Sequence, residues 1–159
     1  MVTIQESAVD APEALSLLEE YFRSRELGFA NQNVVYSIAF PAVDAFTAPA
    51  GVFVIARDES GRAVGCGGIR RVPSGQNGTR YELKHLYLRP ETRGRGWGRN
   101  LLSALESHAQ ALGASELVLD THHSLTAAGA LYASAGYMLT DPYNDNPNAT
   151  RWYVKSLVG

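Results

Sequence analysis

Arginine and glycine alternate from Arg93 to Arg99, in the order Arg-Gly-Arg-Gly-Trp-Gly-Arg. Glycine has no Cβ atom, so the backbone N–H groups of such a turn can converge on a ligand. A strand-like run precedes the turn and is stopped by Pro90, and a helical pattern opens at about Trp97. The first amides of a helix have no partners within it and carry the positive end of the helix dipole. The pattern therefore predicts an anion site, and the anion we expect is a pyrophosphate.

Two other phosphate loops do not match this spacing. A Walker loop needs Lys followed by Ser or Thr after its last glycine, whereas Gly98 is followed by Arg99 and Asn100. A dinucleotide fingerprint spaces its glycines as G-x-G-x-x-G, and here they are spaced G-x-G-x-G. An ordinary flexible Arg-Gly turn is the remaining alternative. A flexible linker, however, would not lie between an apolar strand and an amphipathic helix.

The spacing of Arg93, Gly96 and Gly98 meets the pattern Q/R-x-x-G-x-G/A. With the preceding ELKHLYLRPE and the later ALYASAGY, it resembles the GNAT acyltransferase superfamily. The resemblance extends from about Gly51 to Leu157. It implies a mixed α/β (α+β) fold, in which a mostly antiparallel central sheet is flanked by helices and splayed between its fourth and fifth strands. It also implies that residues 1–159 form a single N-acetyltransferase domain.

The same resemblance implies acetyl-CoA as co-substrate, threaded through the gap in the sheet. Its pyrophosphate is expected on the glycine loop, and its pantetheine arm beside exposed strand backbone, paired like an added strand. Leu125 stands where the family often has an asparagine, so no side-chain hydrogen bond to acetyl-CoA is expected there. The cofactor-binding residues implied in this way are Leu86, Tyr87, Leu88, Arg93, Gly94, Arg95, Gly96, Trp97, Gly98, Arg99 and Tyr132.

Acyl transfer to an amine requires removal of a proton, because an alkylammonium of pKa about 10.4 is only on the order of 0.1% neutral at pH 7. The resemblance makes Glu82 the candidate base, six residues before Leu88, where several family members place a glutamate. Simple alternation puts Glu82 on the same face as Lys84 and puts His85 opposite, in the core or in a substrate wall. The alternative is a Glu82 that is ion-paired at the exposed beginning of its strand.

Tyr132 is the candidate acid. It lies four residues before the helix-ending Gly136, where the superfamily commonly has a tyrosine that donates a proton to the leaving thiolate. The alternative is a tyrosine that only packs against the sheet.

The composition indicates one ordinary globular domain, with 159 residues, 45% apolar and 19% charged. A net charge of −2 argues against a nucleic-acid partner. Cys66 is the single cysteine and lies in an apolar run, which favours a buried core thiol and a reducing cytoplasm. No membrane segment or export signal is indicated. His122 and His123 have no ligands at metal-binding spacing, so no metal is expected.

In the first third of the chain, Asp10 and Glu13 suggest a capping box for a helix that ends near Gly28. Residues 29–50 have no clean period and are expected to be mobile or partly helical, either as a substrate wall or lid or as a plain surface connection.

From residue 51 the pattern predicts a three-strand meander, with a polar loop over residues 73–79 before the strand at 81–88. A helix then ends at Gly113, residues 116–120 form a buried strand, and Ser124 caps a second helix that ends at Gly136. The C-terminal segments YMLT and RWYVKSL are expected to form a closing hairpin.

Two function classes remain open. The first is an N-acetyltransferase of the cytoplasm, monomeric or homodimeric, in which a primary amine of a small molecule, amino-acid derivative or peptide attacks the thioester directly. The second is a non-catalytic acyl-CoA sensor of the same fold. The sequence does not name the acceptor, which residues 29–50 and 143–148 are expected to select.

Overall fold

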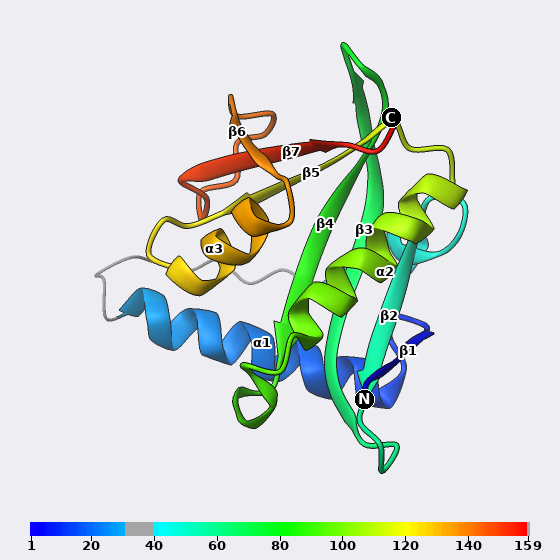
Figure 1. The fold of residues 1–159 in the computed structure, drawn as a ribbon, viewed down its shortest axis with the longest axis vertical. Helices are drawn as coiled ribbons and strands as arrows, with labels where there is room; N and C mark the ends of the chain where they lie inside the picture. The colour runs from blue at the N-terminus through cyan, green and yellow to red at the C-terminus, as the bar shows by residue number, and fades with distance from the viewer. Residues whose placement is uncertain (31–39, 159) are drawn as a thin grey trace.

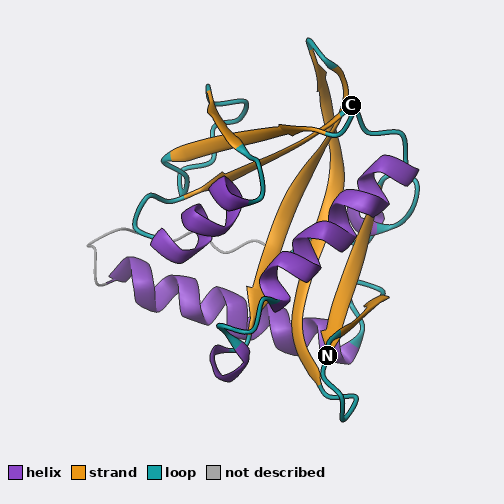
Figure 2. Cartoon of the chain, viewed as in Figure 1, coloured by secondary structure: helices purple, strands orange, loops and turns teal. Residues whose placement is uncertain are grey.

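The computed structural model describes residues 1–30 and 40–158 (Figure 1). In this part of the chain, seven strands form one sheet, and three α-helices pack against it (Figure 2). The strands are β1 (Thr3–Glu6), β2 (Gly51–Arg57), β3 (Ala63–Gly75), β4 (Gly78–Leu88), β5 (Glu116–Thr121), β6 (Met138–Thr140) and β7 (Arg151–Ser156). The helices are α1 (Pro12–Ala30), α2 (Trp97–Ala111) and α3 (Thr126–Ser134), with 3₁₀ turns η1 (Asp44–Phe46) and η2 (Pro90–Thr92).

The sheet divides between β4 and β5. Its order is β1-β2-β3-β4-β5-β7-β6, and every neighbouring pair is antiparallel except β4 and β5, which are parallel. These two strands pair only where Arg80–Glu82 meets Glu116–Val118. Beyond that point they diverge, and β5, β7 and β6 form a separate arm (Figure 1). The mixed sheet, splayed between its fourth and fifth strands, is confirmed.

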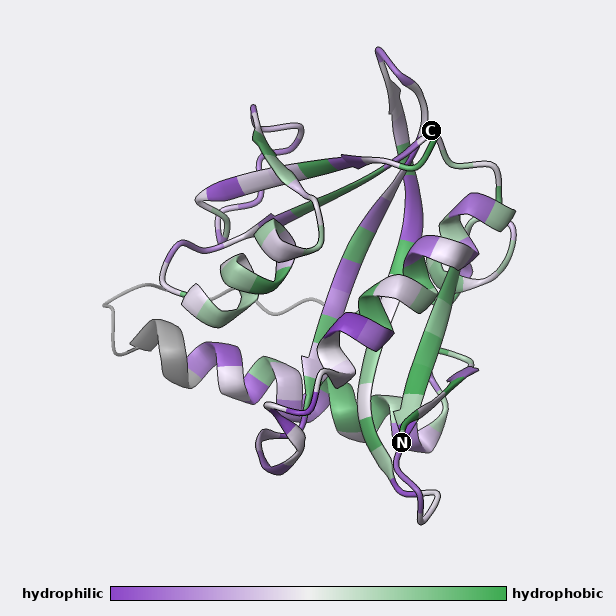
Figure 3. Ribbon diagram, in the orientation of Figure 1, coloured by the Kyte–Doolittle hydropathy of each residue, from purple (hydrophilic) through white to green (hydrophobic). Residues whose placement is uncertain are grey.

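Both faces of the first arm are covered by apolar side chains. Alternate residues of β2 point to opposite faces: Val54 joins the cluster under α2, and Phe53 joins the cluster under α1. Because β2 is buried on both sides, it reads as a continuous apolar run, and it is almost uniformly green in Figure 3. The stripe predicted for α2 packs as expected, with Leu101, Leu102, Leu105 and Ala109 buried. Among the described residues, none of the helices has the length and apolarity required to cross a bilayer.

The strand that leads to the glycine loop contains a bulge. Cys66 pairs with Tyr87 and Gly68 pairs with Lys84, so β4 has one residue more than β3 over this interval. His85, within the bulge, has a φ of 60°, a left-handed conformation that costs free energy in a non-glycine residue. The simple alternation expected along this strand therefore holds to Lys84 and is interrupted at His85.

The prediction of a polar loop over residues 73–79 is wrong, because these residues belong to a hairpin. The two strands continue to Gly75 and from Gly78, which pair with each other across a tight turn at Gln76 and Asn77. Gly78 has a φ of 104°, which glycine adopts without a steric penalty. The polar composition of the segment obscured this hairpin, whose two central turn residues are Gln76 and Asn77 and not the Asn-Gly pair.

The two predicted side-chain caps, the capping box of Asp10 and Glu13 and the cap at Ser124, are also absent from the hydrogen bonds of the described residues. Helix α1 begins at Pro12 and continues to Ala30, past Gly28, and the Glu13 carboxylate accepts hydrogen bonds from Arg57 at 2.6 and 2.9 Å instead of forming a capping box. The N-cap of α3 is Leu125 without a side-chain bond. The predicted cap, Ser124, places its Oγ 2.6 Å from Nδ1 of His122. Glu13 thus bonds to a residue distant in the chain, and Ser124 bonds to a residue two positions before it, instead of to the helix amides.

The segment 29–50 was expected to be mobile or partly helical, and its residues 31–39 lie outside the described residues. The described remainder includes η1, whose Phe46 is buried against Phe53 with ring centroids 6.3 Å apart. This part of the segment is therefore packed against the sheet.

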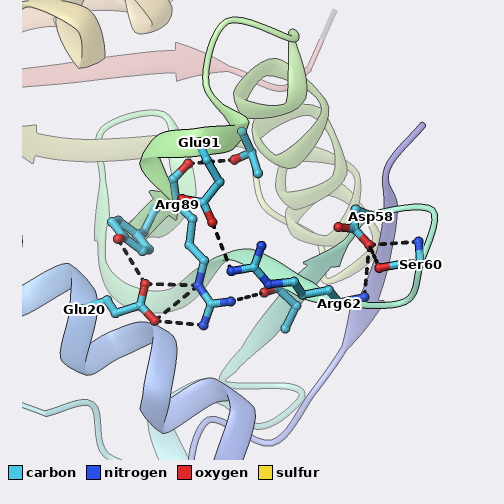
Figure 4. Close-up of polar contacts among 9 residues, drawn as sticks. Glu20, Asp58, Ser60, Arg62, Arg89 and Glu91 are labelled. Carbon is cyan, nitrogen blue, oxygen red and sulfur yellow. Dashed lines mark hydrogen bonds and ion pairs between the residues drawn. The ribbon is translucent and has the colours of Figure 1, made fainter.

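Arg89 fixes the end of β4 immediately before the glycine loop (Figure 4). Its Nε and Nη2 donate to the Glu20 carboxylate of α1 at 2.8 to 3.2 Å, and its Nη1 donates to the carbonyl of Ala63 at 2.9 Å. Nearby, Arg62 pairs with Glu91 at 3.0 Å, but both side chains of that pair are about half exposed. The Arg89 side chain is only 17% exposed. We therefore expect the Arg89 pair to contribute more to stability.

Replacing Arg89 by Ala should lower the free energy of unfolding by about 1 to 3 kcal/mol, because its hydrogen bonds to the Glu20 carboxylate and the Ala63 carbonyl are lost. Replacing Arg62 by Ala serves as the control and should cost less than about 1 kcal/mol, since an exposed ion pair is screened by water. Urea denaturation of both variants measures the difference. Equal losses in the two variants would show that the Arg89 fork does not hold the strand end.

Candidate functional site

A cavity of about 560 Å³ opens where β4 and β5 diverge. Four consecutive residues of β4, residues 83–86, line it, together with Asp120 and Thr121 of β5. Helix α1 contributes Tyr21 and Phe22 to the wall, and α3 contributes Tyr132. The loop between β6 and β7 adds three asparagines. The division of the sheet thus creates a chamber between its two arms.

The glycine loop leads directly into the first turn of α2. Gly94 and Gly96 have φ values of 82° and 79°, and a Cβ atom at either position would meet no heavy atom within 4 Å. Gly96 is the N-cap of α2 and makes no side-chain capping bond. Trp97 is buried in the core, so it can offer a ligand only its backbone amide. The loop therefore has room for an anion at the helix N-terminus.

The arginines of the loop have partners of their own. Arg93 donates from Nε to the carbonyl of Leu88 at 3.1 Å, and Arg99 donates to Oγ of Ser134 at 2.6 Å, joining α2 to α3. The guanidinium of Arg95 lies 5.2 Å from the ring centroid of Trp97. The three cations surround the loop, although two of them also brace its ends.

The strand before the loop lacks a neighbouring strand along one edge. Leu88 and Tyr87 pair with β3 on one side, while the pairing of β4 with β5 on the other side ends at Glu82. The β5-facing edge from Leu86 to Leu88 therefore lacks a neighbouring strand among the described residues. An extended ligand could add to this edge as a strand does.

Tyr132 lies in the cavity wall with 7% of its surface exposed. Its ring packs against those of Tyr137 and Tyr153, with centroids 5.9 and 5.8 Å away. Burial, followed by the nearby Tyr21, raises the pKa of the Tyr132 phenol, so the group is protonated at neutral pH. Tyr132 thus both packs in the core and presents a donor toward the cavity.

Glu82 is fully buried and is not part of the cavity wall. Its carboxylate accepts hydrogen bonds from Arg70 at 2.9 Å, from the Tyr143 hydroxyl at 2.6 Å and from the Asn144 amide at 3.3 Å. The ion pair weighed as an alternative is present, but at a buried position and not at an exposed strand end. Hydrogen bonds from these three charged or polar partners offset the free-energy cost of burying the carboxylate.

Asp120 is a carboxylate of the cavity wall that the sequence reasoning missed. It accepts from Asn144 at 2.6 Å and from Asn146 at 3.1 Å, and Nζ of Lys84 lies 3.8 Å away. The Asn144 amide nitrogen thereby donates to both Asp120 and Glu82. Two signals could have identified this site: an acidic residue at the carboxyl end of a buried strand, and the asparagine-rich loop that follows.

His85 also faces the cavity, as expected for a substrate wall. Its Nδ1 is buried and has no hydrogen-bond partner among the described residues. Burial, with smaller effects from Lys84 and Arg70, lowers the pKa of His85 to about 3, so the imidazole is neutral at neutral pH. Its ring centroid lies 5.6 Å from those of Tyr21 and Phe22.

The remaining reactive side chains are Cys66 and the two neighbouring histidines, His122 and His123. Cys66 is buried, and burial raises the pKa of its thiol, in agreement with the predicted core position. His122 and His123 stack with centroids 4.4 Å apart, and His122 alone of the two lines the cavity. Within residues 1–30 and 40–158, no three His, Cys, Asp or Glu side chains gather as metal ligands would.

Comparison with known proteins agrees with this geometry. Residues 12–137 match the model of the Acetyltransferase (GNAT) family. An uncharacterized N-acetyltransferase of Schizosaccharomyces pombe is 38% identical over 153 residues, which cover 94% of this chain and 91% of the relative.

Two solved structures share the fold. An acetyltransferase from Streptococcus agalactiae aligns with a TM-score of 0.76 at 21% identity, covering 98% of each chain. A GNAT family acetyltransferase from Elizabethkingia anophelis, solved with acetyl-CoA bound, aligns with a TM-score of 0.65 at 18% identity over 98% of this chain and 97% of that one. The family match extends over most of the chain, and the relative is similar along nearly its full length. The divided sheet, the glycine loop and these similarities together show that this protein belongs to the GNAT acetyltransferase family.

Proposed function

We propose that the protein, as one N-acetyltransferase domain over residues 1–159, transfers the acetyl group of acetyl-CoA to a primary amine. The observation that carries this proposal is the meeting of three features at one gap: the open glycine loop, the unpaired edge of β4 and the cavity lined by Tyr132 and Asp120. A relative of the same fold binds acetyl-CoA, which supports assigning the gap to this ligand.

The residues present fit acetyl-CoA in two places. The amides from Gly94 to Gly98 would hold its pyrophosphate, with Arg93, Arg95 and Arg99 nearby, because Cβ atoms are absent where the phosphates must approach. The backbone of Leu86, Tyr87 and Leu88 would pair with the pantetheine amides. The thioester would then lie beside the cavity that Tyr132 lines.

The proposed reaction is a direct displacement. The neutral amine attacks the thioester carbonyl carbon, a C–N bond forms, the C–S bond breaks, and the electron pair of that bond remains on sulfur. Tyr132 hydrogen-bonds to the sulfur and supplies its proton, and the second proton released from the attacking nitrogen as the amide forms restores the Tyr132 hydroxyl. The proton lost by the ammonium goes to the pair of carboxylates linked by Asn144, in which Asp120 faces the cavity and Glu82 lies behind it.

Replacing Gly96 by Val should weaken acetyl-CoA binding at least tenfold, which is about 1.4 kcal/mol, because a side chain would occupy the phosphate position. Gly61 has a similar φ of 84° and equally open surroundings, but it lies in the β2–β3 turn, so Gly61→Val controls for backbone strain. Calorimetric titration compares the two. Unchanged affinity in a folded Gly96→Val variant would refute the loop assignment.

Replacing Tyr132 by Phe removes the hydroxyl and retains the ring. We expect kcat to fall by about one to three orders of magnitude with little change in acetyl-CoA affinity, since a positioned acid is lost. Tyr137→Phe is the matched control, because Tyr137 is also buried but donates to Glu106 at 2.7 Å, away from the cavity. Free-thiol release measures turnover. Parental kcat in Tyr132→Phe would mean that the tyrosine only packs.

Replacing Glu82 by Gln retains the shape of the side chain and removes its basicity. The rate at neutral pH should fall by about 10²-fold and recover in part at high pH, where the amine loses its proton unaided. Glu116→Gln is the control, since Glu116 is likewise buried and pairs with Arg80 at 2.9 Å outside the cavity. A pH–rate profile identical to that of the parent would restrict Glu82 to a structural role.

A further inference from the structure

The charges in the cavity wall limit which amines can enter. Three cationic side chains line it, those of Arg25, Arg70 and Lys84, and Asp120 is the one carboxylate among the described lining residues. Even when the buried Glu82 behind Arg70 is counted, three cations face two carboxylates. An acceptor with several ammonium groups would therefore meet net repulsion, whereas an acceptor with an anionic group would balance the wall.

Arg70 is placed to receive that anion. It lies opposite Glu82 in the β3–β4 ladder, and its Nε and Nη2 both approach Oε1 of Glu82 at 2.9 Å. Glu82 is fully buried, while the Arg70 side chain is 41% exposed. A guanidinium has five N–H donors, so binding Glu82 along one edge leaves donors on the exposed side for a second carboxylate. Glu82 thereby holds the Arg70 fork in a fixed orientation toward the cavity.

Aromatic side chains form the other part of the wall. Phe22 packs against Phe40 with ring centroids 5.0 Å apart, and Phe40 remains 56% exposed although it is a large apolar residue. Tyr21 and Phe46 complete this side around the neutral His85. A surface of this kind gains free energy by covering an apolar or aromatic group of a ligand.

We propose that the acceptor is an amino acid or a close derivative, in which the amine is accompanied by one carboxylate and an apolar, preferably aromatic, side chain. Arg70 binds the carboxylate, the aromatic wall covers the side chain, and Asp120 faces the amine. Polyamines and aminoglycoside-like polycations are poor acceptors. This inference rests on the proposed acetyl transfer and specifies its substrate class.

The test compares four amines at fixed acetyl-CoA, with kcat/KM measured by thiol release. L-Phenylalanine should exceed L-phenylalaninol, in which a hydroxymethyl group replaces the carboxylate, by about tenfold or more, because an Arg–carboxylate bond is lost. L-Phenylalanine should also exceed L-alanine, which lacks the ring, and spermidine should be the poorest of the four. Preference for spermidine, or equal rates with L-phenylalanine and L-phenylalaninol, would overturn the proposed acceptor class while acetyl transfer stands. Release of thiol with none of these or any other amine would instead overturn the proposed function.

A matched pair of variants tests the role of Arg70. In Arg70→Gln the ratio of kcat/KM between L-phenylalanine and L-phenylalaninol should fall to near one, and this ratio is insensitive to any fraction of protein that fails to fold. The neighbouring Arg71 is exposed and does not line the cavity, so Arg71→Gln should keep the parental ratio. A parental ratio in Arg70→Gln would show that another group binds the carboxylate.

Discussion

The short pairing of β4 with β5 is the constraint on which the rest of the structure depends. Three residue pairs join the strands, and beyond them each strand has lost one neighbour. Unpaired strand edges are normally costly or prone to aggregation, so a fold retains them where a ligand completes them. The bulge at His85 increases the local twist on the β4 side of the division and brings four consecutive residues to the cavity.

A partly buried polar network holds the division in place. Asn144 donates to Glu82 on β4 and to Asp120 on β5, and its own carbonyl accepts from Nε1 of Trp152 on β7 at 2.9 Å. One side chain from the β6–β7 loop thus fixes the two arms and orients both carboxylates. Because every member is hydrogen-bonded, the network costs less than isolated buried charges would, and it sets the spacing of the cavity walls. The same groups that stabilise the division therefore also determine its chemistry.

Features that depend on residues close together in the chain were mostly predicted from the sequence. The glycine loop, the α2 stripe and the stops at Gly113 and Gly136 follow from φ preferences and periodicity, and these glycines have φ values of 91° and 94°. Errors arose where a capping residue had another partner: Glu13 bonded to Arg57, 44 residues away in the chain, and Ser124 bonded to the nearby imidazole of His122. Asp120 was missed because its role depends on a loop more than 20 residues away in the chain, at Asn144. The acidic strand end and the asparagine-rich loop were visible in the sequence, but their pairing in space was not.

The most direct test of the central account, that the gap between the two arms holds acetyl-CoA, is backbone hydrogen exchange with and without this ligand. We expect the amides of Leu86 to Leu88 and Gly94 to Gly98 to become protected, because the ligand would add a strand to β4 and cover the start of α2. Amides of the β2–β3 turn at Gly61 should not change. Protection confined to other elements, or unchanged exchange along β4 at saturating acetyl-CoA, would contradict the account.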